Sequence, residues 1–154
     1  MSRADELVEA VRTQPAGRGF LAGGGSPATL DELEQDLGKR LPTDLRELLL
    51  RSDGIGVARP TGFFLPSVLG LRRLNGDDLY AGAFPGALLV GDDGASGLYL
   101  VDVEGRFGGR PGDVLLTDRG SLLARDTVVA GSSVSEVLAA VLAGEDLWSR
   151  PRLG

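Results

Sequence analysis

The feature that most constrains this chain is the stretch from Thr29 to Gly54, which reads TLDELEQDLGKRLPTDLRELLLRSDG. In its first half, leucines recur three and four residues apart, and acidic or amide side chains fill the positions between them. This spacing gives a helix one apolar face. Thr29 and Glu32 have the spacing of a capping box, and Gly38 stands where a left-handed residue ends a helix.

The second half of this stretch predicts another helix. Leu41-Pro42 interrupts the chain, and either Thr43 or Asp44 can cap the helix that follows. Its apolar face is formed by Leu45, Leu48 and Leu49, and Gly54 is expected to end it. Two short helices joined by a tight elbow form a helical hairpin with one shared apolar side. We therefore predict such a hairpin over residues 29–54.

The hairpin resembles the opening signature of the SUKH superfamily. The resemblance is carried by Glu34, Leu37-Gly38, Leu41-Pro42, Leu45-Arg46, Leu48-Leu49 and Ser52-Asp53-Gly54. Leu45 stands where the family usually has an aromatic residue, and Asp53 where it usually has asparagine. Downstream, Phe84–Asp102 resembles the family's middle strands and Ser133–Gly144 its closing helix. The resemblance therefore covers most of the chain from Thr29 onward.

The resemblance implies a function as well as a fold. The SUKH superfamily includes yeast cell-wall-assembly regulators of the Smi/Knr type and many bacterial immunity proteins. For a bacterial chain of this size, it implies a non-catalytic protein-binding module, an immunity protein that neutralises a cognate toxin, commonly a nuclease, by occlusion. The alternative is a Smi/Knr-type scaffold or regulator that binds an endogenous, non-toxic partner. A small-ligand binder or enzyme built on the glycine-rich loops is the third hypothesis.

Composition excludes several kinds of chemistry. The chain contains no cysteine and no histidine, which excludes disulfides, cysteine nucleophiles, imidazole catalysis and the usual zinc sites. The first residues are charged and amphipathic, so we expect no signal peptide. No apolar run approaches the ~20 residues that a membrane span needs. We expect a soluble, cytoplasmic protein without membrane contact.

Negative charge is concentrated in the second half of the chain. Eight acidic residues lie between Asp77 and Asp118, against only two arginines, and this excess equals the net charge of −6 of the whole chain. An acidic face repels nucleic acid and attracts a basic partner by electrostatic steering. The candidate partner-contact residues are Asp77, Asp78, Asp92 and Asp93, and the expected partner is a basic protein. The alternative is that these acids only form local hydrogen bonds in turns.

No catalytic or nucleotide-binding motif is complete. Gly38-Lys39 is followed by Arg40 instead of serine or threonine, so it is not a phosphate loop. The Gly54-Ile55-Gly56 segment lacks the third glycine of a dinucleotide fingerprint. Asp92-Asp93-Gly94 lacks the alternating acids and the later glutamate of a calcium loop. We expect no enzyme activity, no cofactor, no metal and no nucleic-acid partner.

The order of the expected elements is helices, then strands joined by turns, then a helix, which is an α+β pattern. We predict a single domain over residues 1–154, with N-terminal helices including the hairpin, a mainly antiparallel sheet of about four to six strands and a C-terminal helix. The expected segments are an N-terminal helix with a glycine-rich connector at 1–28, the hairpin at 29–54, the sheet at 60–130, a helix at 133–144 and a tail at 145–154.

Finer expectations concern single segments. The connector is expected to be a flexible loop, and residues 68–74 to be extended or loosely helical. In the strand Leu98–Val103, alternate side chains should face opposite sides of the sheet. Residues 114–117 and 122–124 are expected to pair across a turn, with a short edge strand at 128–129. Trp148 is expected to pack at the rim of the core.

Overall fold

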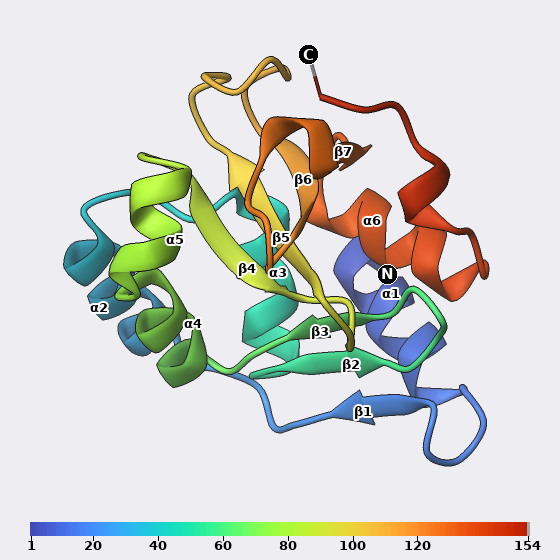
Figure 1. The fold of residues 1–154 in the computed structure, drawn as a ribbon. Helices are drawn as coiled ribbons and strands as arrows, with labels where there is room; N and C mark the ends of the chain where they lie inside the picture. The colour runs from blue at the N-terminus through green and yellow to red at the C-terminus, as the bar shows by residue number, and fades with distance from the viewer. Residues whose placement is uncertain (154) are drawn as a thin grey trace.

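The computed structural model describes residues 1–153 and shows a seven-stranded antiparallel sheet. The strands lie side by side in the order in which they occur in the chain (Figure 1). Their bounds are β1 Gly19–Leu21, β2 Ile55–Val57, β3 Phe63–Leu65, β4 Leu88–Asp92, β5 Gly97–Asp102, β6 Asp113–Asp118 and β7 Thr127–Gly131. The predicted antiparallel sheet is confirmed, with more strands than the expected four to six.

Six α-helices are inserted around these strands in the described part of the chain. One precedes β1, two separate β1 from β2, two separate β3 from β4, and the last follows β7. Their bounds are α1 Arg3–Arg12, α2 Pro27–Leu37, α3 Thr43–Arg51, α4 Val68–Asn75, α5 Asp78–Ala83 and α6 Val134–Leu142. The α+β class, with N-terminal helices and a C-terminal helix, is confirmed. None of the helices in residues 1–153 has the length and hydrophobicity needed to cross a lipid bilayer.

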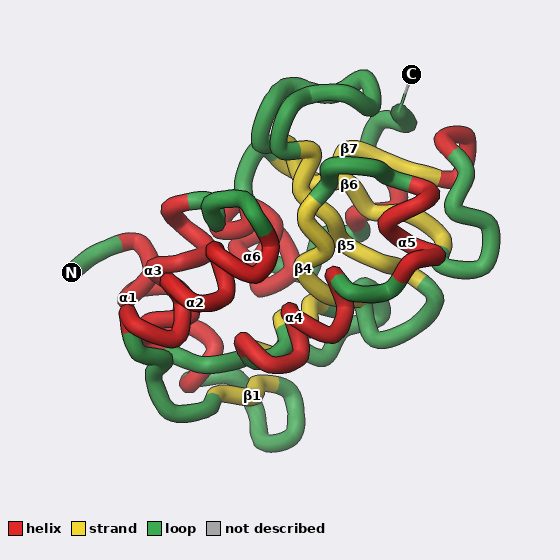
Figure 2. The backbone as a smooth tube through the Cα atoms, turned by 90° about the vertical axis from the view of Figure 1, so that its left-hand side faces the viewer, coloured by secondary structure: helices red, strands yellow, loops and turns green. Residues whose placement is uncertain are grey.

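The two faces of the sheet are covered differently. Helices α1, α2, α3 and α6 gather on one side of the sheet, and α5 lies on the other (Figure 2). The main core lies under the helical layer, whereas Phe84 of the α5 segment covers a smaller core. Strand β5 contributes to both, since Tyr99 and Val101 enter the main core and Leu98 and Leu100 the smaller one. The predicted alternation of this strand is confirmed.

The helical hairpin forms, but its first helix begins earlier than predicted. The hydroxyl of Ser26 accepts a hydrogen bond from the backbone N–H of Thr29 (3.1 Å), and Pro27 occupies the first turn. Proline suits this position because its missing N–H would have no partner inside the helix. The predicted capping box of Thr29 and Glu32 is therefore wrong. The predicted end is confirmed, because Gly38 is left-handed with φ 68°.

The second helix of the hairpin lacks the predicted side-chain cap. Pro42 takes the N-cap position of α3, and neither Thr43 nor Asp44 caps the helix. Instead, the Asp44 carboxylate accepts a hydrogen bond from the backbone N–H of Ser135 (2.7 Å) in the first turn of α6. The residue therefore joins two helices that are far apart in the sequence.

The glycine-rich connector is not simply a flexible loop. Its residues Gly19–Leu21 form β1, which pairs with β2 so that Phe20 lies opposite Gly56. The sheet therefore starts well before the predicted residue 60. Sequence patterns missed both strands because each has only three residues and one of these is glycine, which is depleted in strands.

Three further segments differ from the prediction. Residues 68–74 form the regular helix α4, which the hydroxyl of Ser67 caps at Gly70 N–H (3.3 Å). A second short helix, α5, follows it. Residues 122–124 do not pair with β6; Leu122 adopts a left-handed φ of 56°, and β6 pairs with β7 instead. The predicted edge strand near residues 128–129 is confirmed as part of β7.

Candidate partner-binding surface

Asp77 and Asp78 lie at the corner between α4 and α5. Both residues are exposed, and so is Leu79, whose exposed fraction of 66% is unusually large for a leucine. The Asp77 carboxylate accepts a hydrogen bond from the Leu79 N–H (2.9 Å) and caps α5. In contrast, no hydrogen bond or ion pair found among residues 1–153 uses the Asp78 side chain. The corner therefore presents a free carboxylate beside an exposed apolar side chain.

Asp92 lies at the end of β4, away from that corner. Its side chain is partly exposed, accepts a hydrogen bond from Gly94 N–H (2.8 Å) and lies 3.8 Å from the Arg119 guanidinium. The start of β4 adjoins α4, because Asn75 exchanges hydrogen bonds with the Leu89 backbone (2.8 and 2.9 Å). The two acidic positions thus lie toward opposite ends of one strand.

Asp93 has a structural role instead of an exposed one. Only 3% of the residue is exposed. Its carboxylate accepts hydrogen bonds from Ala95 N–H (2.9 Å), Gly97 N–H (2.8 Å) and the Trp148 indole N–H (3.1 Å). A buried carboxylate with three donors cannot meet a partner without losing them. The structure therefore removes Asp93 from the predicted contact residues, which leaves Asp77, Asp78 and Asp92.

The structure also shows an apolar surface that sequence reasoning missed. Strand alternation sends Phe20, Gly56 and Phe64 to the face of β1–β3 that the helices do not cover, and Asp92 lies directly opposite Phe64 on β4. We call these four residues the open face. A groove of about 360 Å³ lies along it and is completed by neighbouring residues such as Leu21 and Pro66.

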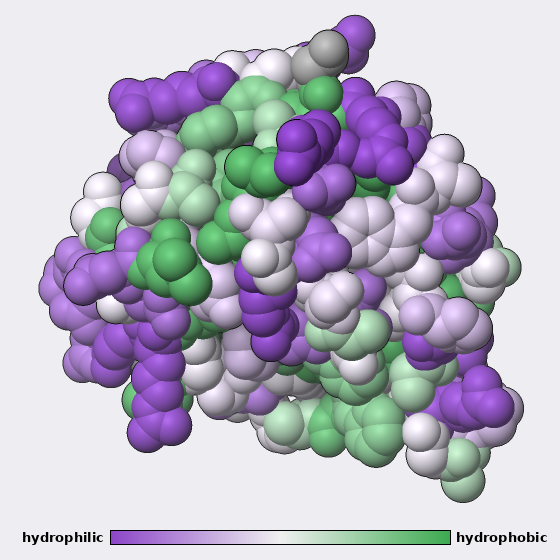
Figure 3. All heavy atoms as spheres, in the orientation of Figure 1, coloured by the Kyte–Doolittle hydropathy of each residue, from purple (hydrophilic) through white to green (hydrophobic). Residues whose placement is uncertain are grey.

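The shape of the open face depends on its glycine. The Phe20 and Phe64 ring centroids are 6.4 Å apart, and a Cβ atom at Gly56 would touch both rings. Phe20 remains 49% exposed, and Figure 3 shows hydrophobic atoms on the surface over β1 and β2. The only sequence signal for this surface was an isolated aromatic residue inside a glycine-rich segment.

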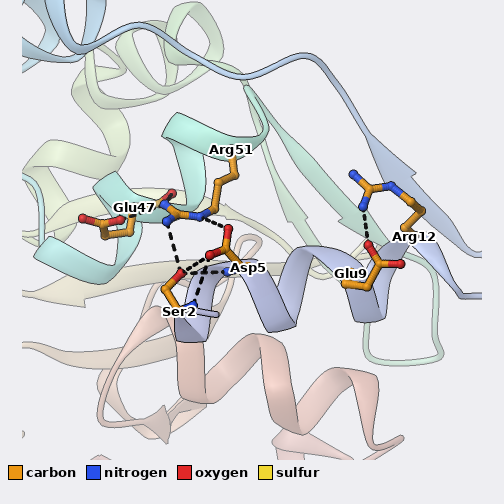
Figure 4. A network of polar contacts seen from close by, with 6 residues as sticks. All are labelled: Ser2, Asp5, Glu9, Arg12, Glu47 and Arg51. Carbon is orange, nitrogen blue, oxygen red and sulfur yellow. Dashed lines mark hydrogen bonds and ion pairs between the residues drawn. The ribbon is translucent and has the colours of Figure 1, made fainter.

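An ionic network joins two helices on the helical side of the molecule. The Asp5 carboxylate accepts hydrogen bonds from Arg51 Nε (2.6 Å) and from the Ser2 backbone N–H (3.1 Å), and Arg51 also binds Glu47 (Figure 4). Chiefly the Arg51 guanidinium, and then Ser2, hold the pKa of the Asp5 carboxyl well below its usual range. The same pairing raises the pKa of Arg51. These contacts join α1 to α3.

The candidate surface contains no arrangement of metal ligands. Within residues 1–153, no three acidic side chains lie close enough together to share a metal ion.

The Tyr99 hydroxyl is buried and lies away from the candidate surface. Burial raises its pKa, and it donates a hydrogen bond to the Gly62 carbonyl (2.8 Å) inside the core. The exposed groups at the corner and on the open face can make ionic and apolar contacts with another macromolecule.

Comparison with models of protein families places most of the chain in one family. The model of the SMI1/KNR4 family (SUKH-1) matches residues 24–139, which include the hairpin, α4, α5 and strands β2 to β7. Helix α1, strand β1 and the tail with Trp148 lie outside the matched residues. No curated protein matches the chain.

Proposed function

The chain belongs to the SMI1/KNR4 family (SUKH-1), and from this we propose that it is a non-catalytic protein-binding module, an immunity protein that neutralises a cognate toxin in the cytoplasm. The partner is a basic protein, and its inhibition is stoichiometric. We infer that the toxin is a nuclease. An enzyme that cleaves nucleic acid needs a cationic cleft to hold phosphate groups. Such a cleft is the surface that an acidic protein can cover.

The observation that carries this proposal is the α4–α5 corner. Asp78 is exposed and has no partner among residues 1–153, and Leu79 beside it exposes most of its side chain. An unpaired carboxylate attracts a cationic surface at long range, whereas a desolvated leucine adds short-range affinity. The two neighbours together have the chemistry of a contact with a basic protein. Asp92, at the end of β4, provides a second acidic position.

The mechanism follows from the charges. Association is accelerated by attraction between the acidic corner and the basic cleft, and screening by salt slows it. Once the corner is in place, the rigid sheet behind it blocks the cleft from nucleic acid. No residue of this chain takes part in a chemical step.

The test starts from capture of the partner. Tagged protein is used to isolate binding proteins from its native lysate, with washes at low and high salt. We expect a single basic protein that is lost at high salt, that is toxic when expressed alone and that becomes harmless when this chain is co-expressed. A nuclease assay of the captured protein, titrated with this chain, should reach complete inhibition at a ratio of one to one.

Other results would contradict the immunity role. A captured partner that is harmless when expressed alone would instead indicate a scaffold or regulator of the Smi/Knr type. An empty capture, combined with a thermal shift caused by one small molecule, would indicate a ligand-binding protein, since a ligand that binds only the native state stabilises it.

A further inference from the structure

The two edges of the sheet are protected unequally. At the β7 edge the chain covers itself: Val129 N–H donates to the Pro151 carbonyl (2.9 Å) and Leu153 N–H donates to the Thr127 carbonyl (2.9 Å). At the β1 edge no element of the described chain lies beyond the strand (Figure 1). Uncovered edge strands offer unpaired backbone groups to a second strand.

The direction of the free backbone groups can be deduced from the hydrogen bonds of β1. The Ala58 N–H donates to the Arg18 carbonyl (2.8 Å), so residue 18 faces β2. In an antiparallel ladder the facing groups alternate along the strand. Phe20 therefore also faces β2, whereas the N–H and C=O groups of Gly19 and Leu21 point outward. Outside the β1–β2 ladder, no hydrogen bond found in residues 1–153 uses the backbone of Gly19 or Leu21.

We propose that β1 pairs with β1 of a second copy of this chain, in antiparallel orientation about a two-fold axis at Phe20. Gly19 of each copy then lies opposite Leu21 of the other, and the two pairs exchange four backbone hydrogen bonds. The contact is isologous, so it closes as a dimer and does not extend into a fibre. The two seven-stranded sheets become one continuous sheet.

The side chains of the open face suit this arrangement. Residues directly opposite each other in an antiparallel pair point to the same side of the sheet, so the two Phe20 rings meet on the open face. Each ring already lies beside Phe64 of its own copy, with centroids 6.4 Å apart. The dimer thus joins two short aromatic rows into one, and it removes the exposed area of Phe20 from water.

The charges at the ends of β1 are complementary between the copies. The pairing places Arg18 of one copy beside Ala22 and Gly23 of the other, and the Gly23 carbonyl accepts a hydrogen bond from the Asp53 N–H (2.7 Å). Neither Arg18 nor Asp53 forms an ion pair among residues 1–153; one oxygen of the Asp53 carboxylate accepts a hydrogen bond from the Val68 N–H (2.8 Å), which leaves the other oxygen for a cation. The two-fold axis brings each Arg18 toward an Asp53 of the other copy. This complementarity favours a second copy over an unrelated apolar partner.

The proposal does not depend on the immunity role and is tested on the pure protein. Sedimentation equilibrium between about 1 and 500 µM should show a mass that rises from one chain to two, with a dissociation constant on the order of tens of micromolar, since a three-residue strand buries less than a standard interface. Phe20→Lys should raise this constant about tenfold or more. Leu123→Lys is the matched control, because Leu123 is similarly exposed but precedes the opposite edge strand.

A cross-linking experiment locates the axis. The chain contains no cysteine, and opposing residues of a pair without hydrogen bonds have Cα atoms about 4.5 Å apart, within the range of a disulfide. Phe20→Cys should therefore form a disulfide-linked dimer about ten times faster than Leu123→Cys under the same oxidant.

A wild-type protein that remains monomeric at 500 µM in sedimentation equilibrium would overturn the proposal. So would a dimer that Phe20→Lys and Arg18→Glu, each folded by circular dichroism, leave unchanged.

Discussion

Two adjacent aspartates at the end of β4 have different roles because their side chains point in different directions. Asp92 is the last residue of β4 and keeps part of its carboxylate in water, whereas Asp93 turns inward and accepts three hydrogen bonds. One of its donors is Trp148, which is distant in the sequence. Local patterns can predict that acids occupy a turn, but they cannot predict which carboxylate meets a partner from another part of the chain. The expected packing of Trp148 at the core rim is confirmed.

The role of Asp93 leads to a prediction about stability. Asp93→Ala should reduce the free energy of unfolding by about 2–4 kcal/mol, because it leaves the N–H groups of Ala95, Gly97 and Trp148 without an acceptor in a buried site. Asp93→Asn should cost less, since one oxygen remains for the two backbone donors. Urea unfolding followed by Trp148 fluorescence measures both. An alanine variant as stable as the wild type would contradict the structural role.

Asp5 leads to a prediction about pH. Its pKa is lower in the folded chain than in the unfolded chain, whose aspartates titrate near 4. The contact with Arg51 therefore stabilises the fold fully above that value and is lost as the pH falls below it. Asp5→Asn should be less stable than the wild type at pH 7, and the difference should shrink toward pH 2.

The measurement is the urea midpoint at pH 7, 4 and 2, at low salt. Glu6→Gln is the matched control, because Glu6 lies in the same exposed helical turn and has only a long contact with Arg3 (3.7 Å). A difference between Asp5→Asn and the wild type that does not change with pH would show that the loss comes from packing instead of charge.

At the scale of elements, the helices were easier to predict than the strands. The Thr29–Gly54 hairpin and the last helix have leucines or valines at helical spacing, and this signal survives tertiary packing. The first residues of these helices were harder to predict, since an N-cap depends on the backbone conformation of a single residue. Ser133 and Glu136 at the start of α6 have the spacing of a capping box, but only half of it forms: the Ser133 hydroxyl accepts a hydrogen bond from the Glu136 N–H (3.1 Å), whereas the Glu136 carboxylate accepts one from the Ser132 N–H. Strands β1 and β2 were missed because each is three residues long and contains a glycine.

The corrected start of α2 can be tested directly. Ser26→Ala should reduce the free energy of unfolding by about 1 kcal/mol, because the Ser26 hydroxyl caps the Thr29 N–H. Glu32→Ala should change it by less than about 0.5 kcal/mol, because Glu32 is exposed and caps nothing. Thermal and urea unfolding of the two variants measure this. The opposite order of effects would restore the capping box that the sequence suggested.

At the scale of the molecule, the α+β class and the family could be predicted because the hairpin signature and the order of elements are local features. The exposure of the candidate contact residues could be predicted only in part. Asp77, Asp78 and Asp92 lie at the surface as expected, whereas Asp93 does not, and the open face depends on the pairing of strands that are far apart in the sequence. Such a surface appears only when the sheet is assembled.

In the proposed function, the acidic α4–α5 corner captures a basic partner. The most direct test is the association rate constant of the captured partner, measured across ionic strength for the wild type, Asp78→Lys and Glu32→Lys. The two variants change the net charge equally, and both positions are exposed and without ion pairs among residues 1–153. We predict that the wild-type rate falls with salt and that Asp78→Lys slows association several-fold more than Glu32→Lys at low salt. Equal rates for the two variants would contradict capture at the corner, because the position of the charge would then not matter.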